Sequence, residues 1–339
     1  MDRRKCLTTL IGVAGCVAVP PVRSSFGSAL AFSPQGRGEQ KAPPMIPGPD
    51  PNTKTPAYKA PPGAVDTHTH IFGPPGRYPY APVRSYTAPD APLEMFRALH
   101  EKIGIDRAVI VNATLHGTDN RVVTDAIAAG NGRYKGIANV DYGISDRELE
   151  DLARAGIKGC RFIFISRLGA RPDLSKISRI AERIKPLGWH IDLYLEAQHL
   201  DDFRPTLTTL ATNYVIDHMG AIQVGTGVSE PAFKSLVGLA QRDEKCWIKI
   251  TGPERMSKCG APFYDAVPIA QQLIAAAPDR VIWGSDWPHP NVPIMPNDGD
   301  LVDLIPLYVP HPIMQRKLLI DNPTRLFGFG PWPAPTQRG

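Results

Sequence analysis

The stretch AVDTHTHIFG, residues 64–73, places two histidines, His68 and His70, at the end of an apolar run. Side chains two residues apart on a β-strand share a face, so a strand here would direct both imidazoles and Asp66 the same way. The pattern also occurs on solvated strand faces. The turn that follows, THTHIFGPPG, is not the G-x-G-x-x-G phosphate turn that a doubly wound dinucleotide-binding sheet would carry after its first strand.

From this stretch onward, β-rich runs alternate with segments whose apolar residues lie three and four apart. The predicted strands cover residues 64–72, 107–113, 135–141, 157–165, 190–197, 214–220, 246–252 and 280–285. The predicted helical segments include residues 92–104, 146–156, 174–188, 230–242 and 264–278. Ser145 or Asp146 can cap one helix, and Gly104 and Gly188 follow helix ends. Eight such units over roughly 260 residues predict an α/β fold, a (β/α)8 TIM-like barrel in a single domain.

The polar residues at the carboxyl ends of these strands are the candidate functional residues, because the active sites of TIM barrels lie at these ends. They are His68 and His70 (first strand), Arg161 with Arg167 just beyond (fourth), Tyr194 and Glu196 (fifth), Asp217 and His218 (sixth), Glu254 and Arg255 (after the seventh), and Asp286 and His289 (eighth and just after). Packing does not explain polar residues at matching ends of so many strands. The sequence therefore predicts a functional site at this mouth.

Three histidines and an aspartate can activate water in two ways. His68, His70, His218 and Asp286 could bind one metal ion, for which zinc or manganese suits the ligand types. Without metal, Asp286 could take a proton from water while the imidazoles hydrogen-bond a carbonyl oxygen that gains charge. Nucleophilic serine chemistry is not indicated, because the sequence lacks a G-x-S-x-G turn.

Arg161, Arg167 and Arg255 favour an anionic substrate, because a guanidinium offers a planar fork of donors to a carboxylate or sulfonate. Three such groups around one pocket suggest a substrate with two acidic groups. The alternative for each arginine is an internal ion pair with Asp or Glu. Tyr86 and Tyr194 could donate hydroxyl hydrogens to the substrate or could belong to the core.

The chain has 339 residues, of which 36 are proline, and a net charge of +5. The basic residues of positions 1–31 (Arg3, Arg4, Lys5 and Arg23, against Asp2) supply three of these charges and leave +2. That charge, without a basic run interleaved with aromatics, predicts no nucleic-acid binding. The Pro-rich residues 32–63 read as a linker or irregular arm, residues 64–329 as the barrel, and residues 330–339 as a tail.

Residues 1–31 resemble an export signal. Adjacent arginines at Arg3 and Arg4 precede a modest apolar stretch, and Ala29-Leu30-Ala31 is a small-residue cleavage site. The pattern is typical of a twin-arginine signal, which predicts a periplasmic protein. The alternatives are a basic, disordered N-terminus of a cytoplasmic protein and a lipoprotein box ending at Cys16. No apolar run in the sequence reaches the roughly 18 residues that a membrane-spanning helix needs.

Five cysteines occur, and Cys6 and Cys16 lie in the predicted signal. The other three, Cys160, Cys246 and Cys259, are odd in number and lack C-x-x-C spacing. This excludes a disulfide framework and a cysteine zinc site, and it predicts buried thiols.

The motifs VDTHTHIFGP, CRFIFISRLG, IDLYLEA, VIDHMG, IKITGPERMS and VIWGSDWPHPN together resemble the amidohydrolase superfamily. The resemblance covers residues 64–329 and is greatest to the amidohydrolase-2 branch of lactone hydrolases that act on 2-pyrone-4,6-dicarboxylate and 4-sulfomuconolactone. It implies a distorted (β/α)8 barrel. The residues it implies around the lactone carbonyl are His68, His70, His218 and Asp286, with Asp286 activating water. The substrate-binding residues it implies are Arg161, Arg167, Arg255, Tyr86 and Tyr194.

The resemblance thus implies a lactonase, a hydrolase of ester bonds, that opens an unsaturated dianionic lactone in aromatic catabolism. The export signal favours 4-sulfomuconolactone, opened to maleylacetate and sulfite, over 2-pyrone-4,6-dicarboxylate. Strand four carries Arg161 rather than a lysine for carboxylation, so we expect at most one metal ion, zinc, or none. Two further hypotheses are a metal-dependent decarboxylase and a non-catalytic periplasmic binder of aromatic acids. The presence of both the histidine pair and Asp286 argues against the binder.

Overall fold

The computed structural model describes residues 43–165 and 173–333. The predicted export segment, residues 1–31, and the predicted substrate-binding residue Arg167 lie outside these ranges, as does most of the predicted tail.

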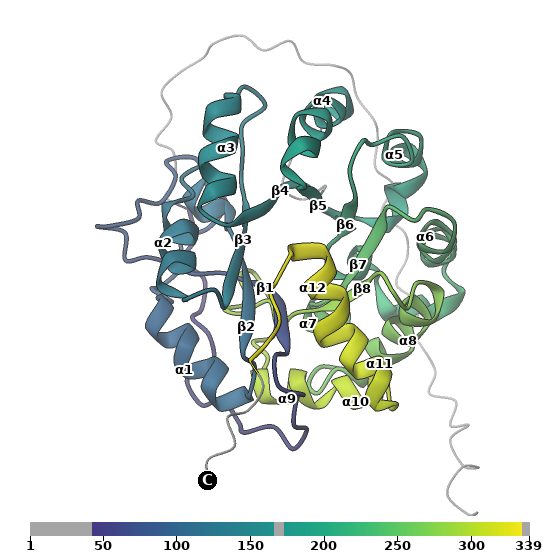
Figure 1. Ribbon diagram of the computed structural model, residues 1–339. Coiled ribbons are helices and arrows are strands. Elements are labelled where there is room, and N and C mark those ends of the chain that lie inside the picture. The colour runs from purple at the N-terminus through teal and green to yellow at the C-terminus, as the bar shows by residue number, and fades with distance from the viewer. Residues whose placement is uncertain (1–42, 166–172, 334–339) are drawn as a thin grey trace, which may run out of the picture. The chain divides into compact units, whose positions relative to one another are not determined.

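Eight parallel strands form one sheet in sequence order, and helices surround it (Figure 1). The strands are β1 (Val65–Thr69), β2 (Arg107–Val111), β3 (Tyr134–Ala138), β4 (Ile157–Phe164), β5 (His190–Leu195), β6 (Tyr214–Ile216), β7 (Cys246–Ile250) and β8 (Val281–Trp283). Each strand is parallel to the next one along the chain, with a register shift on β1 between Asp66 and Thr69. The fold is therefore the predicted (β/α)8 barrel.

The sheet closes where β1 meets the segment that follows β8. The Asp286 N–H donates to the His68 carbonyl (2.8 Å), and the His70 N–H donates to the Trp287 carbonyl (2.7 Å). The Asp66 carboxylate also accepts from the Ser285 N–H at 2.9 Å. Barrel closure thus fixes Asp286 beside the histidine pair, although 216 residues separate Asp286 from His70 along the chain.

The helices are α1 (Leu93–Ile103), α2 (Arg121–Ala129), α3 (Asp146–Arg154), α4 (Leu174–Ile184), α5 (Leu200–Leu207), α6 (Pro231–Arg242), α7 (Pro253–Met256), α8 (Val267–Ala276), α9 (Asp298–Asp303), α10 (Ile305–Tyr308), α11 (Pro312–Arg316) and α12 (Asn322–Phe327). Ser145 caps α3 in a capping box with Glu148, and Gly104 ends α1 in the left-handed conformation. The sequence periodicity located α1, α3, α4, α6 and α8. None of the helices in the described part of the chain is long and apolar enough to cross a bilayer.

The strands end one to four residues earlier than predicted. β6, for example, stops at Ile216 rather than at residue 220. The residues beyond it leave the extended conformation, because His218 and Met219 both have φ of 50°. Apolar character continues past the last ladder hydrogen bond, so composition alone places these boundaries too late.

An apolar cluster fills one end of the barrel interior. It contains Val65, Val109, Val111, Ile137, Val215, Trp247, Ile282, Phe327 and Phe329. Because side chains from β2 and β3 meet others from β6 and β7, the cluster lies inside the barrel. Phe327, at the end of α12, and Phe329 join it from the C-terminal segment, whose α12 packs beside β8. The Arg107 guanidinium lies 4.9 Å from the Phe329 ring and donates to the Gly63 carbonyl. One end of the barrel is therefore closed, which leaves the other for a site.

Part of the predicted linker packs on the barrel. Met45 bridges to Thr87, and the Tyr58 N–H donates to the Asp303 carboxylate at 2.8 Å. Residues 43–63 therefore form an attached arm (the arm, below).

The prediction of buried thiols is right for two of the three cysteines outside the export segment. Cys160 and Cys246 are buried on β4 and β7, whereas Cys259 is exposed. Cys259 lies in the loop after α7, where no strand carries it into the core.

Gly284 tests the barrel closure. A Cβ added there would lie 2.7 Å from the His68 backbone nitrogen and 2.9 Å from the His68 Cβ. We expect Gly284→Ala to lower the free energy of unfolding by about 1–3 kcal/mol, because it forces β1 and β8 apart. Urea denaturation measures this. The control is Gly143→Ala, since no atom of the described chain lies within 4 Å of its added Cβ. Equal effects of the two substitutions would contradict this account of the closure.

Candidate active site

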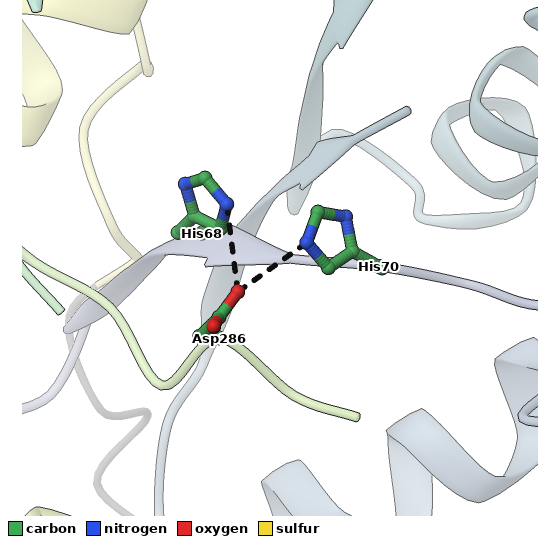
Figure 2. Close-up of side chains that lie close together, drawn as sticks. All are labelled: His68, His70 and Asp286. Carbon is green, nitrogen blue, oxygen red and sulfur yellow. Dashed lines mark ion pairs between the residues drawn. The ribbon is translucent and has the colours of Figure 1, made fainter. Parts of the chain in front are cut away.

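Two imidazoles face one carboxylate at the open end of the barrel. Figure 2 shows the rings of His68 and His70 turned toward Asp286. The Asp286 Oδ1 lies 3.6 Å from the His68 Nε2 and 3.3 Å from the His70 Nε2. The His218 ring, after β6, lies 4.8 Å from the His68 ring centroid to centroid. All four side chains are buried. The structure thus brings together four predicted site residues from three strand ends.

Two of these residues have an unusual backbone. Asp286 has φ of 70° and His218 has φ of 50°, which is the left-handed region that favours glycine. Residues other than glycine that are held in this backbone conformation lower the stability of the fold, and they are concentrated at functional sites. The geometry supports a functional reading of both positions.

Each histidine makes a second contact that orients its ring. The His70 Nδ1 lies 2.8 Å from the Val111 carbonyl oxygen. The His218 Nδ1 lies 2.8 Å from the Thr251 hydroxyl. The His68 Nδ1 lies 3.2 Å from the Nζ of Lys249, a fully buried lysine on β7. The rings are therefore fixed from the side opposite to the pocket.

Cations keep the buried carboxylates ionised. Burial opposes the charge on Asp286, but the Arg255 guanidinium, which donates to it at 2.7 Å, holds its pKa well below the usual value. Burial likewise opposes the charge on Asp217, but Lys249 and Arg161 hold its pKa well below the usual value. The Arg161 Nε donates to Asp217 at 2.8 Å.

The imidazoles of His68 and His218 are neutral by the same physics. Burial, reinforced by the charge of Lys249, lowers the pKa of His68 to about 3. Burial also lowers the pKa of His218 well below the usual value, although Asp286 acts in the opposite direction. Neutral rings can serve as hydrogen-bonding partners or as ligands of a metal ion.

The arginines predicted to bind substrate are engaged inside the protein. Arg161 pairs with Asp217 and Arg255 with Asp286, as the internal-pair alternative describes. Both also line a small cavity of about 50 Å³, together with His70, Tyr86, Tyr194, His218 and Asp286. Their guanidinium groups therefore remain within reach of a ligand in this cavity.

The small cavity adjoins a larger one of about 570 Å³, because Tyr194, His218, Arg255 and Asn291 line both. Ile46 and Pro47, from the arm, also line the larger cavity. Burial raises the pKa of Tyr86 to about 12, so its hydroxyl keeps its hydrogen and can donate it. The volume suits a small organic acid.

The residues present fit a single metal ion. The ligand atoms of His68, His70 and Asp286 lie within 4.8 Å of one another. Among the described residues, the buried His68 Nε2 and Asp286 Oδ1 have no hydrogen-bond partner, so both atoms are available as ligands of a cation. His218 belongs to a different group, with His68 and Asp217, and its Nε2 lies 3.4 Å from the Arg161 guanidinium.

Sequence reasoning overlooked Lys249 and Asp192, which lie one layer below the pocket. Lys249, on β7, contacts Asp192 on β5 and lies 3.2 Å from Asp217. All three side chains are fully buried. The signal was present, because Lys249 is a charge within the apolar strand CWIKI, as Arg161 is within CRFIFI. A buried charge in such a strand requires a partner of opposite sign.

The chain is similar to known proteins over most of its length. The sequence model of a family described as Amidohydrolase matches residues 65–329. A 2-pyrone-4,6-dicarboxylate hydrolase of Comamonas testosteroni is 42% identical over 83% of this chain and 94% of its own length. A 4-sulfomuconolactone hydrolase of Rhizobium radiobacter is 39% identical over 86% of this chain and 98% of its own. A crystal structure of an Agrobacterium tumefaciens protein superposes with a TM-score of 0.73 at 28% identity, over 81% of this chain and 99% of that one.

A second buried cluster lies behind Asp286. It consists of Glu254, His289 and Asp298, and the His289 Nε2 lies 3.1 Å from the Asp298 carboxylate. Neither carboxylate oxygen of Glu254 has a hydrogen-bond partner in the described part of the chain. Burial raises the pKa of Glu254 to about 7, against the opposing charges of His289 and Arg255. The pKa of His289 is also raised, because Asp298 outweighs the effect of burial. The cluster therefore binds protons on folding.

This cluster predicts a pH-dependent stability. A carboxyl group whose pKa is raised in the folded state stabilises the fold at low pH and loses that contribution as the pH rises through the folded pKa. The free energy of unfolding should therefore fall between the usual pKa of Glu254, near 4.5, and about 7. The slope should approach about 1.4 kcal/mol per pH unit. Glu254→Gln should remove this component in urea titrations at pH 5, 6 and 7. The exposed Glu244→Gln is the control, and identical profiles for both variants would refute the assignment.

Proposed function

The chain belongs to the amidohydrolase family, and from this membership and the geometry of its pocket we propose that it hydrolyses an unsaturated lactone carrying two acidic groups. It is an ester-bond hydrolase, like relatives that are 38–42% identical to it. One observation carries the proposal: the Asp286 carboxylate faces two imidazole nitrogens in a cavity that two arginines also line.

The proposed reaction begins with a water molecule beside Asp286. The Asp286 carboxylate accepts a proton from this water, and the water oxygen forms a bond to the lactone carbonyl carbon. Hydrogen bonds from the pocket stabilise the charge that develops on the carbonyl oxygen. The bond between the carbonyl carbon and the ring oxygen then breaks. With 2-pyrone-4,6-dicarboxylate, the ring oxygen leaves as an enolate that conjugation stabilises, and its protonation gives an unsaturated oxo-acid. With 4-sulfomuconolactone, the ring oxygen leaves as an alkoxide on the carbon that bears the sulfonate. Collapse of this alkoxide to a ketone breaks the C–S bond, which gives maleylacetate and releases sulfite.

We propose that the substrate itself activates the base, because it competes with Asp286 for the Arg255 guanidinium. Without substrate, the Arg255 guanidinium donates to Asp286 and keeps its pKa low, which makes the carboxylate a weak base. An acidic group of the substrate would compete for the same guanidinium. Binding of a dianionic lactone would thereby weaken the Arg255–Asp286 pair and raise the basicity of Asp286 in the complex. A neutral lactone would lack this effect.

We propose two forms of this chemistry that the same residues can support. In the first, Asp286 and the imidazoles act without metal. In the second, one zinc ion held by His68, His70 and Asp286, with His218 nearby, would polarise the carbonyl and lower the pKa of bound water. The unpartnered His68 Nε2 and Asp286 Oδ1 support the second form. The contacts of His68 discussed below support the first.

The identity of the lactone is a separate proposal. Relatives with either substrate in their name are similarly close, at 42% and 39% identity. We propose 4-sulfomuconolactone, opened to maleylacetate and sulfite, because residues 1–31 resemble a signal for export to the periplasm. The alternative substrate is 2-pyrone-4,6-dicarboxylate. The names of both relatives describe hydrolysis, which favours ring opening over decarboxylation.

Asp286→Asn tests the base. The amide cannot accept a proton from water, so we expect kcat to fall about 100- to 10,000-fold. Binding of the lactone should persist, because Arg161 and Tyr194 are unchanged. Stopped-flow absorbance gives kcat, and equilibrium titration gives the dissociation constant. The control is the exposed Asp141→Asn. Wild-type turnover by Asp286→Asn would exclude this carboxylate as the base.

Ultraviolet absorbance of both lactones, before and after treatment of the purified protein with a chelator, tests the substrate. We expect loss of the conjugated chromophore with 4-sulfomuconolactone at a higher kcat/KM than with 2-pyrone-4,6-dicarboxylate. The reverse order would favour the alternative, and turnover of neither would reject the lactonase. Treatment with the chelator distinguishes the metal-free reaction from the zinc-assisted reaction, because only the zinc-assisted reaction would lose its turnover.

A further inference from the structure

Lys249 lies at the centre of a buried polar network that the proposed reaction does not use. Its ammonium contacts Asp192, lies 3.2 Å from the Asp217 Oδ1 and lies 3.2 Å from the His68 Nδ1. Below it, the Asp192 Oδ1 lies 3.2 Å from the His190 Nε2. The side chains of Lys249, Asp192, Asp217 and His68 are all fully buried. The network is therefore shielded from solvent.

The donors in this network decide which nitrogen of His68 carries hydrogen. A lysine ammonium can only donate hydrogen bonds. At 3.2 Å from the His68 Nδ1, it requires a lone pair on that nitrogen. A neutral imidazole carries its single hydrogen on the other nitrogen, so the His68 Nε2 bears the hydrogen and points it toward Asp286.

The neighbouring histidines have the opposite arrangement. The Val111 carbonyl can only accept, so the His70 Nδ1 carries a hydrogen. The Arg161 guanidinium can only donate, so the His218 Nε2 is an acceptor and its Nδ1 donates to Thr251. His68 thus differs from both, and Lys249 is the group that makes it differ.

We propose that Lys249 is a positioning residue that holds the hydrogen of His68 on Nε2, so that His68 acts as a hydrogen-bond donor to the lactone carbonyl oxygen rather than as a metal ligand. The target of this donor rests on the proposed function, whereas the position of the hydrogen rests on contacts within the protein alone. The His68 Nε2 lies 3.6 Å from the Asp286 Oδ1, and Asp286 lines the small cavity, so this donor lies beside the position that the lactone would occupy.

Asp217 is the alternative hydrogen-bond partner of the His68 Nδ1. The Asp217 Oδ1 lies 3.5 Å from the His68 Nδ1, farther than Lys249. If Asp217 took a hydrogen from Nδ1, the Nε2 would present a lone pair. A carboxylate behind a histidine is the common arrangement at metal sites. The choice between Lys249 and Asp217 as the partner of His68 therefore separates the metal-free form of the site from the metal-binding form.

Long-range 1H–15N correlation spectra of the folded full-length protein test the hydrogen position directly. We expect His68 with its hydrogen on Nε2 and His70 with its hydrogen on Nδ1, each assigned by the signal that disappears in His68→Gln and His70→Gln. A His68 signal with hydrogen on Nδ1 would overturn the proposal. This measurement uses no substrate, so its failure differs from a failure of the lactonase assay.

Lys249→Met provides the second test. Removal of the ammonium lets the His68 Nδ1 donate to Asp217, so the affinity for Zn²⁺ should rise at least about tenfold in competition with a chelating dye. Loss of the donor to the carbonyl oxygen should lower kcat roughly 100-fold in chelated buffer, with little change in KM. A purely structural role of Lys249 would not raise zinc affinity.

The control is Lys234→Met, which removes an exposed lysine on α6 and should change neither quantity. A folded Lys249→Met protein with unchanged zinc affinity and unchanged kcat would refute the proposal. If the variant does not fold, because Asp192 and Asp217 lose their cation, the spectra of the wild-type protein still decide it.

Discussion

Closure of the barrel between β1 and β8 is the constraint on which the site depends. Hydrogen bonds between Asp286 and His68, and between His70 and Trp287, join backbone atoms and therefore do not depend on side-chain identity. They nevertheless fix the distance between the carboxylate and both imidazoles. The absence of a side chain at Gly284 allows this approach. The geometry of the candidate site is thus set by the fold, and its side chains supply the groups for the proposed chemistry.

The chemistry in turn depends on charge balance among fully buried side chains. Asp192, Asp217 and Asp286 are fully buried, and Lys249, Arg161 and Arg255 lie against them. Ionised groups in such surroundings are tolerated only when opposite charges and hydrogen bonds compensate the lost hydration. Burial, together with the charges of Lys249 and Arg161, lowers the pKa of His68 and leaves its ring neutral. A ligand that enters the pocket therefore meets fixed donors and acceptors rather than mobile charges, which is the arrangement that favours charge development in a transition state.

The sequence predicted the barrel and the positions around its mouth because both follow from periodicity. His68, His70, His218 and Asp286 stand at strand ends, and strand ends can be recognised from local pattern. Pairings between distant strands could not be recognised in this way. Arg161 and Arg255 were expected to face the substrate, whereas each also binds an aspartate that follows a different strand. Lys249 was a visible signal, but its three partners come from β1, β5 and the end of β6, and only the register of the closed barrel brings them together.

The arm has a consequence for how such a pocket can diverge. Ile46 and Pro47 line the larger cavity, yet they precede the part of the chain that the family model matches. A segment outside the barrel is under weaker packing constraints than a strand, and loops and peripheral segments accept insertions and replacements readily. Selectivity for the bulky end of a ligand can therefore evolve by exchange of this peripheral segment, while the reacting groups stay untouched within the conserved architecture.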